Sequence, residues 1–124
     1  MKLDVKAWID KMMKVQSMSF TRADNSYVNA TNFGRITGRY CGHTGVINLN
    51  LSLSANMPTN TQNVKIGTMS PIPKQDVLLE IPCQSNNSTI LLAISSSTGD
   101  MVIFNLSGTA TGTNWFRASI PVIV

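Results

Sequence analysis

An alternating stretch near the middle of the chain limits the possible folds more than any other part of the sequence. Between Gly45 and Ala55, aliphatic side chains recur at every second position, and small uncharged polar side chains fill most positions between them. The aliphatic residues are Ile47, Leu49, Leu51 and Leu53. A period of two predicts a β-strand with one buried face, and that face needs an apolar sheet to cover it.

Further segments with strand patterns surround this stretch, and turn-forming residues separate them. The predicted strands cover residues 33–40, 44–55, 62–68, 76–84, 89–95, 101–106 and 114–123. Pro71 and Pro73 exclude a central strand between the third and fourth of these, and Gly99 suits a tight turn. Seven short strands with regular turns predict a sandwich or a barrel. We expect a mainly β protein with an antiparallel, jelly-roll-like β-sandwich.

Several predicted strands carry apolar side chains on both faces. In the segments 77–83 and 89–95, Leu78 and Leu91 lie opposite the main aliphatic rows. Charged residues make up 13% of the chain, about half the usual share, and are too few to cover such a surface. The pattern predicts that the outer sheet face packs on another element or on another subunit.

The first fifteen residues have a helical period instead. Asp4 is a suitable N-cap for a helix that begins at Val5. The apolar side chains at heptad positions a and d of this helix are Val5, Trp8, Met12 and Val15. A helix of about three turns is marginal alone in water. It therefore packs either on its own β-domain or on copies of itself, and the pattern alone favours neither.

The segment that follows the helix has no periodic pattern. Residues 16–32 are rich in Ser, Thr, Asn and Asp and predict an irregular linker. The chain thus divides into an N-terminal helix and linker, residues 1–32, and a β-sandwich domain, residues 33–124. No signal peptide and no apolar run of about 20 residues is present, so we expect synthesis in the cytoplasm without membrane insertion.

The net charge of +4 does not indicate a nucleic-acid partner. Four lysines in the first fourteen residues are interleaved with Asp4 and Asp10, and the other basic residues are scattered singly. A nucleic-acid-binding domain would cluster them on one face or along one helix. We interpret the positive charge as a solvated surface.

No set of residues suited to catalysis or metal binding stands out. His43 is the only histidine, no Gly-x-Ser-x-Gly motif is present, and six carboxylates leave little scope for a glycosidase pair. Cys41, His43 and Cys83 offer three zinc ligands without a fourth. We expect no enzyme activity, metal or cofactor, with His43 in a turn. Buried thiols are the default for the two cysteines, and a disulfide between them stays open.

The order of segments from residue 33 onward resembles a known family. Residues 45–53 form a Gly-led alternating strand, 64–69 read Val-Lys-Ile-Gly-Thr-Met, and 70–74 form a proline-containing loop. A strand over 77–83, the segment Ile-Ser-Ser-Ser-Thr-Gly-Asp-Met-Val-Ile and an aromatic strand over 115–124 follow. This order resembles the C-terminal head domains of tail fibres and receptor-binding proteins from phages and prophages of Gram-positive bacteria.

The resemblance implies a homotrimeric head in the virion tail that recognises host cell-surface polysaccharide. The N-terminal helix would then be the end of a trimeric stalk, and other phage tail proteins would be partners. Two alternatives stay open. One is a purely structural tail protein that assembles without a ligand. The other is a trimeric jelly roll of the tumour-necrosis-factor or complement-head kind, which binds proteins.

Saccharide binding needs planar stacking surfaces and planar polar groups. The candidates in the sequence are Asn114, Trp115, Gln84, Asn86 and Asn87. The first pair begins the last predicted strand, and the other three lie in one predicted loop. The alternative for Trp115 is a place in the core.

Overall fold

The computed structural model describes residues 4–124, apart from the side chains of residues 10–13. Within this part the helices are α1 (Val5–Met13) and α2 (Ala30–Phe33). The strands are β1 (Val15–Ser17), β2 (Ser19–Arg22), β3 (Thr37–Cys41), β4 (Thr44–Ser52), β5 (Thr61–Ser70), β6 (Val77–Pro82), β7 (Thr89–Ile94), β8 (Asp100–Asn105) and β9 (Trp115–Ile123).

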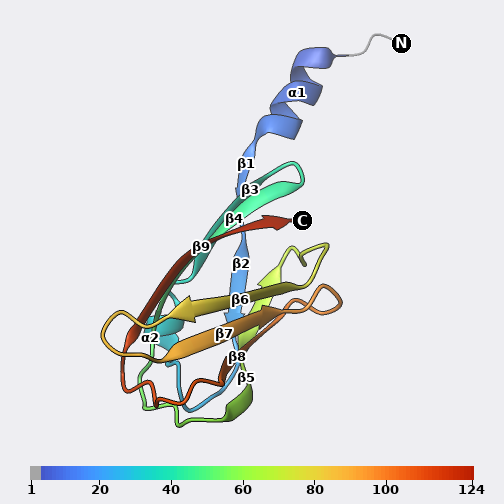
Figure 1. The fold of residues 1–124 in the computed structure, drawn as a ribbon. Coiled ribbons are helices and arrows are strands. Elements are labelled where there is room, and N and C mark those ends of the chain that lie inside the picture. Colours follow the sequence, from blue (N-terminus) through green and yellow to red (C-terminus); the bar gives the residue numbers. More distant parts are fainter. Residues whose placement is uncertain (1–3) are drawn as a thin grey trace.

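The nine strands form two antiparallel sheets that pack against each other (Figure 1). The four-stranded sheet has the order β1-β3-β4-β9, and the five-stranded sheet has the order β2-β5-β8-β7-β6. The prediction of a mainly β, antiparallel sandwich with a short N-terminal helix is confirmed. All seven predicted strands are present with shifted ends, and β1 and β2 are additional.

Strand β4 lies between β3 and β9 and supplies one face of the core. The alternating aliphatic side chains, three within β4 and Leu53 directly after it, are at most 3% exposed, as the period of two predicts. All nine of its residues pair with β9, from Thr44 opposite Ile123 to Ser52 opposite Trp115. The facing sheet contributes the fully buried residues Ile66, Ile90, Leu92, Met101 and Ile103. The core therefore lies between the two aliphatic sheet faces.

The predictions for the segment before β3 need correction. Residues 16–32, predicted as irregular, contain most of β1, all of β2 and the start of α2. Phe33, predicted to begin a strand, instead ends α2 with its side chain 4% exposed, and β3 begins at Thr37. The physical reason is a local cap, because the Asn29 side chain accepts a hydrogen bond from the Asn32 backbone N–H at 2.8 Å.

One extended segment passes from the four-stranded sheet into the five-stranded sheet. Strand β1 pairs with β3, β2 pairs with β5, and Met18 lies between them with its side chain 7% exposed. Two glycines leave room for this side chain: a Cβ on Gly38 would meet the Met18 sulfur, and one on Gly45 would lie 2.5 Å from its methyl carbon. The N-terminal segment is thus part of both layers.

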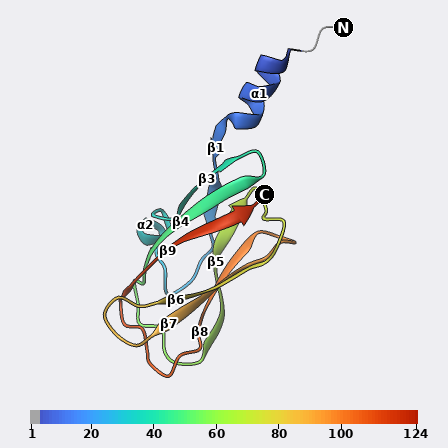
Figure 2. The ribbon, with the colours of Figure 1, turned by 45° about the horizontal axis from the view of Figure 1, so that its top comes forward.

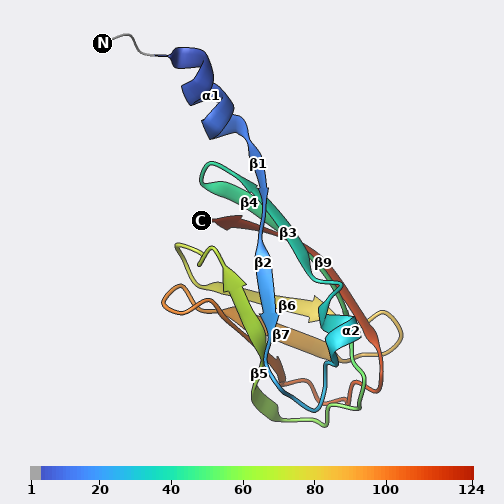
Figure 3. The ribbon, with the colours of Figure 1, turned by 180° about the vertical axis from the view of Figure 1, so that it is seen from behind.

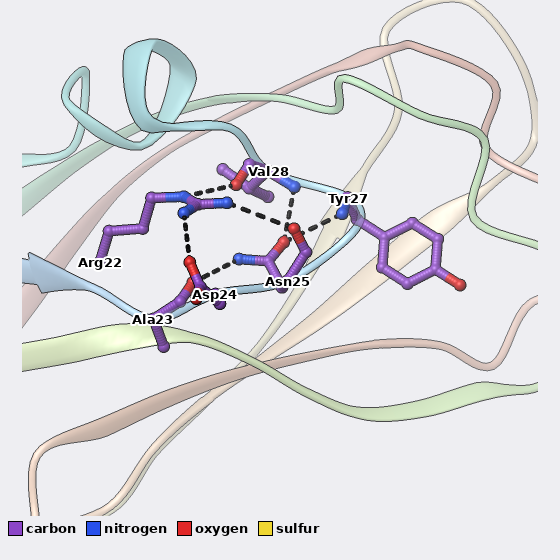
Figure 4. A network of polar contacts seen from close by, with 6 residues as sticks. All are labelled: Arg22, Ala23, Asp24, Asn25, Tyr27 and Val28. Carbon is purple, nitrogen blue, oxygen red and sulfur yellow. Dashed lines mark hydrogen bonds and ion pairs between the residues drawn. The ribbon is translucent and has the colours of Figure 1, made fainter.

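The loop after β2 is held by Arg22 and Asn25 (Figure 4). The Arg22 guanidinium donates to the Val28 carbonyl at 2.9 Å and the Asn25 carbonyl at 3.2 Å, and it pairs with Asp24 at 3.2 Å. The Asn25 side chain accepts from the backbone N–H groups of Tyr27 and Val28. All three nitrogens of this guanidinium therefore have partners within the loop.

Helix α1 stands apart from both sheets in all three views (Figures 1, 2 and 3). Asp4 caps it, accepting a hydrogen bond from the Ala7 N–H at 3.0 Å. Three of the predicted a and d side chains are largely exposed: Val5 at 50%, Trp8 at 58% and Val15 at 62%. The fourth, Met12, lies outside the described side chains, and Val15 belongs to β1 and not to the helix. Within one chain, the three described side chains of this stripe are not buried.

The outer face of the five-stranded sheet is apolar, as the two-faced strand patterns predict. Leu78 on β6 is 69% exposed, and half-buried side chains continue the face across β7 and β8. These are Leu91, Ala93, Val102 and Phe104. A shallow hollow of about 430 Å³ lies over part of this face.

Candidate functional site

Three loops meet at the end of the sandwich farthest from α1. The N–H of Thr111 donates to the Met57 carbonyl at 3.1 Å, and the Met57 N–H donates to the Thr111 hydroxyl at 2.9 Å. The Asn86 amide donates to the carbonyls of Ala110 and Thr111. These contacts tie the loops before β5, β7 and β9 into one unit.

Asn105 holds this unit from inside the protein. Its side chain is fully buried and donates to the carbonyls of Met57 at 3.0 Å, Pro58 at 3.2 Å and Thr109 at 3.1 Å. Its carboxamide oxygen accepts from the N–H and hydroxyl of Ser107. Because the buried donors and the acceptor of the Asn105 side chain all have hydrogen-bond partners, the three loops are held in one arrangement.

The structure brings the predicted saccharide-binding residues to this end of the sandwich, in different roles. The backbone N–H of Gln84 donates to the Trp115 carbonyl at 3.3 Å, so the two predicted groups are neighbours. Asn86 uses its amide within the loops and accepts from Ser88, so it has a structural role. Gln84 and Asn87 have exposed side chains, and Asn114 is half-buried.

Trp115 lies on the outer face of the four-stranded sheet and is half-buried, whereas the adjacent Phe116 is fully buried. Two guanidinium groups lie over its indole ring. The central carbon of Arg35 is 5.0 Å from the ring centroid, and that of Arg117 is 5.8 Å from it. Both distances are in the range of cation–π contacts. We call these three residues the Arg–Trp cluster.

The strand register explains why these residues meet. Trp115 and Arg117 are two residues apart on β9, so both point outward, and Arg117 is opposite Asn50 on β4. Arg35 comes two residues before Thr37, which is opposite Asn48 on the other side of β4. The cluster therefore spans β4 from both sides.

Polar side chains of β4 and β9 continue the face beside the cluster. The Ser119 hydroxyl donates to the Asn48 carboxamide oxygen at 3.2 Å. The carboxamide oxygen of Asn50 is buried and accepts no hydrogen bond from the described residues. A shallow hollow of about 450 Å³ lies here, lined by Asn48, Leu49, Asn50, Arg117, Ala118 and Ser119.

The charges are divided unequally between the two sheets. The strands β1, β3, β4 and β9 contain Arg39 and Arg117 and no Asp or Glu. The acidic groups with described partners lie elsewhere: Asp24 pairs with Arg22, and Asp100 pairs with Lys65 at 3.2 Å. The backbone N–H of Ser96 and its side chain hold the pKa of Asp76 below its usual value. The outer face of the four-stranded sheet is therefore positive.

The sequence predictions missed Arg35, Arg117 and Asn50 as site residues. Alternation along the last strand could have paired Arg117 with Trp115, because they are two positions apart. No pattern could have added Arg35, which is 80 positions away from Trp115 and separated from it by β4.

His43 lies in the turn between β3 and β4, as predicted. Its Nδ1 is 2.9 Å from the Val124 carbonyl, and its own carbonyl accepts from the Val124 N–H at 2.8 Å. Cys41 and Cys83 are not joined by a disulfide, and both are half-buried, not buried as predicted. Among the described residues, no three His, Cys, Asp or Glu side chains could hold a metal ion.

No family model, curated protein or solved structure matches this chain. None of the helices in the described part has both the length and the apolar character needed to cross a membrane.

Proposed function

We propose that this protein is a receptor-binding head of a phage or prophage tail, which binds host cell-surface saccharide as a homotrimer. The observation that carries the proposal is the half-exposed Trp115 ring on a polar sheet face, with planar guanidinium and carboxamide groups around it. Such a surface offers stacking and hydrogen bonding together. The family resemblance of residues 33–124 supports the same function.

The position of this face relative to α1 suits an attachment protein. Val15, which follows α1, is opposite Cys41, and Cys41 is opposite Thr44 at the start of β4. Trp115 is opposite Ser52 at the other end of β4. The helix and the saccharide site would thus occupy opposite ends of the sheet, with the helix directed toward the tail and the site toward the host.

Two exposed apolar surfaces support self-association. One is the stripe of α1 and β1 that includes Trp8, and the other is the outer sheet face that includes Leu78. Fully burying one large apolar side chain stabilises a protein by roughly 1.5–3 kcal/mol. Three copies that share these surfaces would gain enough to offset the entropy lost on association.

A structural tail protein without a ligand is the second candidate, because the same apolar surfaces would serve assembly alone. The two candidates differ in their predictions for Trp115. The receptor-binding function requires that the exposed ring contact a saccharide, and the structural function does not. A protein-binding jelly roll, the remaining alternative, would contact a protein at the same place.

The purified protein is expected to bind intact Gram-positive cells or saccharides on a glycan array. Trp115→Ala should weaken this binding by about tenfold, since an aromatic contact contributes up to about 1.5 kcal/mol. Trp115→Phe should retain most of it, because the ring remains. The matched control is Gln62→Ala, an exposed residue of β5 in the other sheet, which should leave binding unchanged. An assembled protein that binds neither cells nor glycans would favour the structural candidate.

Light scattering after size exclusion is expected to give a mass of about 40 kDa, three times the 13.5 kDa of one chain. The paired change Val5→Asp and Trp8→Asp should lower the mass to that of one chain, because it places charges in the apolar stripe. Lys6→Asp adds the same side chain between them, outside the stripe, and should leave the trimer intact. A wild-type mass of one chain would contradict the proposal, and a mass of two chains would exclude the trimer.

A further inference from the structure

Resting on the proposed function, we propose that the Arg–Trp cluster binds the acidic group of the saccharide. The ligand would carry a carboxylate or a phosphate, and the guanidinium groups of Arg35 and Arg117 would hold it. This assigns an anion-binding site to the outer face of the four-stranded sheet. A neutral polysaccharide would leave these two charges unused.

Both guanidinium groups are available to a ligand. Arg35 and Arg117 are exposed, and neither guanidinium group donates a hydrogen bond to, or forms an ion pair with, a described residue. Arg22 provides the contrast within this chain, because its guanidinium is engaged by three partners in its own loop (Figure 4). The two arginines of the cluster thus differ from an arginine that serves the fold.

Trp115 positions these arginines. A guanidinium that lies over an aromatic ring contacts the ring with its flat face and keeps its N–H edges open. Those edges match the two oxygens of a carboxylate or phosphate. The ring therefore reduces the freedom of both side chains without using the donors that an acidic group needs.

The electrostatic setting of the cluster favours an anion over a cation or a neutral group. Two guanidinium groups lie within 5.8 Å of one ring centre, and the four strands of this sheet contain no carboxylate. Like charges held near one another raise the free energy of the unliganded protein, and a bound anion lowers it. Among the acidic groups, Asp24 is paired with Arg22 in the loop after β2, and Asp100 is paired with Lys65 on the five-stranded sheet.

The neighbouring hollow favours a sugar over an isolated ion. Asn48, Asn50 and Ser119 line it with carboxamide and hydroxyl groups, which suit sugar hydroxyls. The Asn50 oxygen has no donor among the described residues, and a buried acceptor without a donor costs free energy. A hydroxyl beside the acidic group would supply that donor once the side chains around Asn50 move. A single-stranded nucleic acid is a less suitable ligand, because its successive bases stack on several aromatic side chains. This face offers one tryptophan, the half-buried Trp115.

The test uses the full chain and two pairs of probes. Oligogalacturonate carries carboxylates and is compared with its fully methyl-esterified form. Pentamannosyl phosphate is compared with the dephosphorylated oligomannose. At least one acidic probe is expected to bind about tenfold more tightly than its neutral partner, as two charge-assisted contacts require. The pair that responds identifies the acidic group as carboxylate or phosphate.

The variants locate the site. Arg35→Gln combined with Arg117→Gln should reduce binding of the acidic probe to the level of the neutral one. Arg39→Gln is the matched control, because Arg39 is exposed on the same sheet but is opposite Val46, away from Trp115. It should leave binding within about twofold of wild type. Equal melting temperatures would show that the variants are folded.

Several results would overturn the proposal. They are no binding of either acidic probe, equal binding of acidic and neutral probes, equal losses in Arg39→Gln and the double variant, or tighter binding of a single-stranded oligonucleotide. Cell binding that survives the double variant would overturn the anion site and leave the proposed function standing. The protein could also bind the acidic probe through both arginines but bind no cells. That result would support the anion site and contradict the proposed function.

Discussion

Asn105→Asp is expected to lower the melting temperature by roughly 10–15 °C, which corresponds to a loss of about 3–5 kcal/mol in the free energy of unfolding. Asn105 is fully buried, and its amide donates to three backbone carbonyls. A carboxylate at the same place would face those carbonyls with an oxygen, and each carbonyl would lose one of its two donors, keeping only Thr111, Thr61 or Ser107. The loops next to Trp115, which begins β9, would lose their internal support.

The pH dependence of this variant provides a second measurement. Burial and the surrounding carbonyls would raise the pKa of the introduced carboxyl in the folded protein above its unfolded value. The folded state would then bind more protons than the unfolded state. The loss of stability relative to wild type should therefore become smaller as pH falls. Asn87→Asp makes the same chemical change at an exposed position and should melt close to wild type. A melting temperature for Asn105→Asp within a few degrees of wild type would contradict this account.

Gly67→Ala is expected to destabilise the sandwich by about 3 kcal/mol, because it overpacks the core where two layers meet. A Cβ on Gly67 would lie 2.5 Å from the Thr21 carbonyl oxygen and would overlap the ring of Phe33. Gly67 is opposite Arg22 on β2 and Met101 on β8, so β5 cannot move away from both neighbours. The free energy of unfolding in urea measures the effect.

Gly108→Ala is the matched control for this change. Apart from the two chain neighbours, no atom of the described residues lies within 4 Å of a Cβ built on Gly108, and the residue is exposed. Its stability should stay within about 0.5 kcal/mol of wild type. If the two variants unfold at the same urea concentration, close packing at Gly67 is not the reason for glycine there.

The core sheets could be predicted from sequence because their strands are long enough to show a period. The four aliphatic residues of β4 and the position directly after it alternate over seven positions, and their burial follows from that alternation alone. Strands β1 and β2 have three and four residues, too few for a period to be seen. Their pairing with β3 and β5 makes them strands, and that pairing depends on the tertiary fold.

The candidate site was only partly predictable for a similar reason. Trp115 and Gln84 could be proposed from residue type, and the backbone hydrogen bond between them places them together. The sequence could not show that Asn86 uses its amide within the loops, because that depends on where residues 110 and 111 lie. Arg35 joins Trp115 only through the arrangement of β3, β4 and β9.

The continuous path from α1 through β1, Met18 and β2 also determines how the protein would carry mechanical load. A tension applied to α1 while the Trp115 end is held runs roughly along the strands, because β1, β3, β4 and β9 pair side by side between these two points. The hydrogen bonds between neighbouring strands are then loaded in shear and share the force, instead of opening one after another. Because β2 pairs with β5, the same pull is also transmitted to the second sheet. A sandwich built in this way would resist such a pull as a whole and not through one strand.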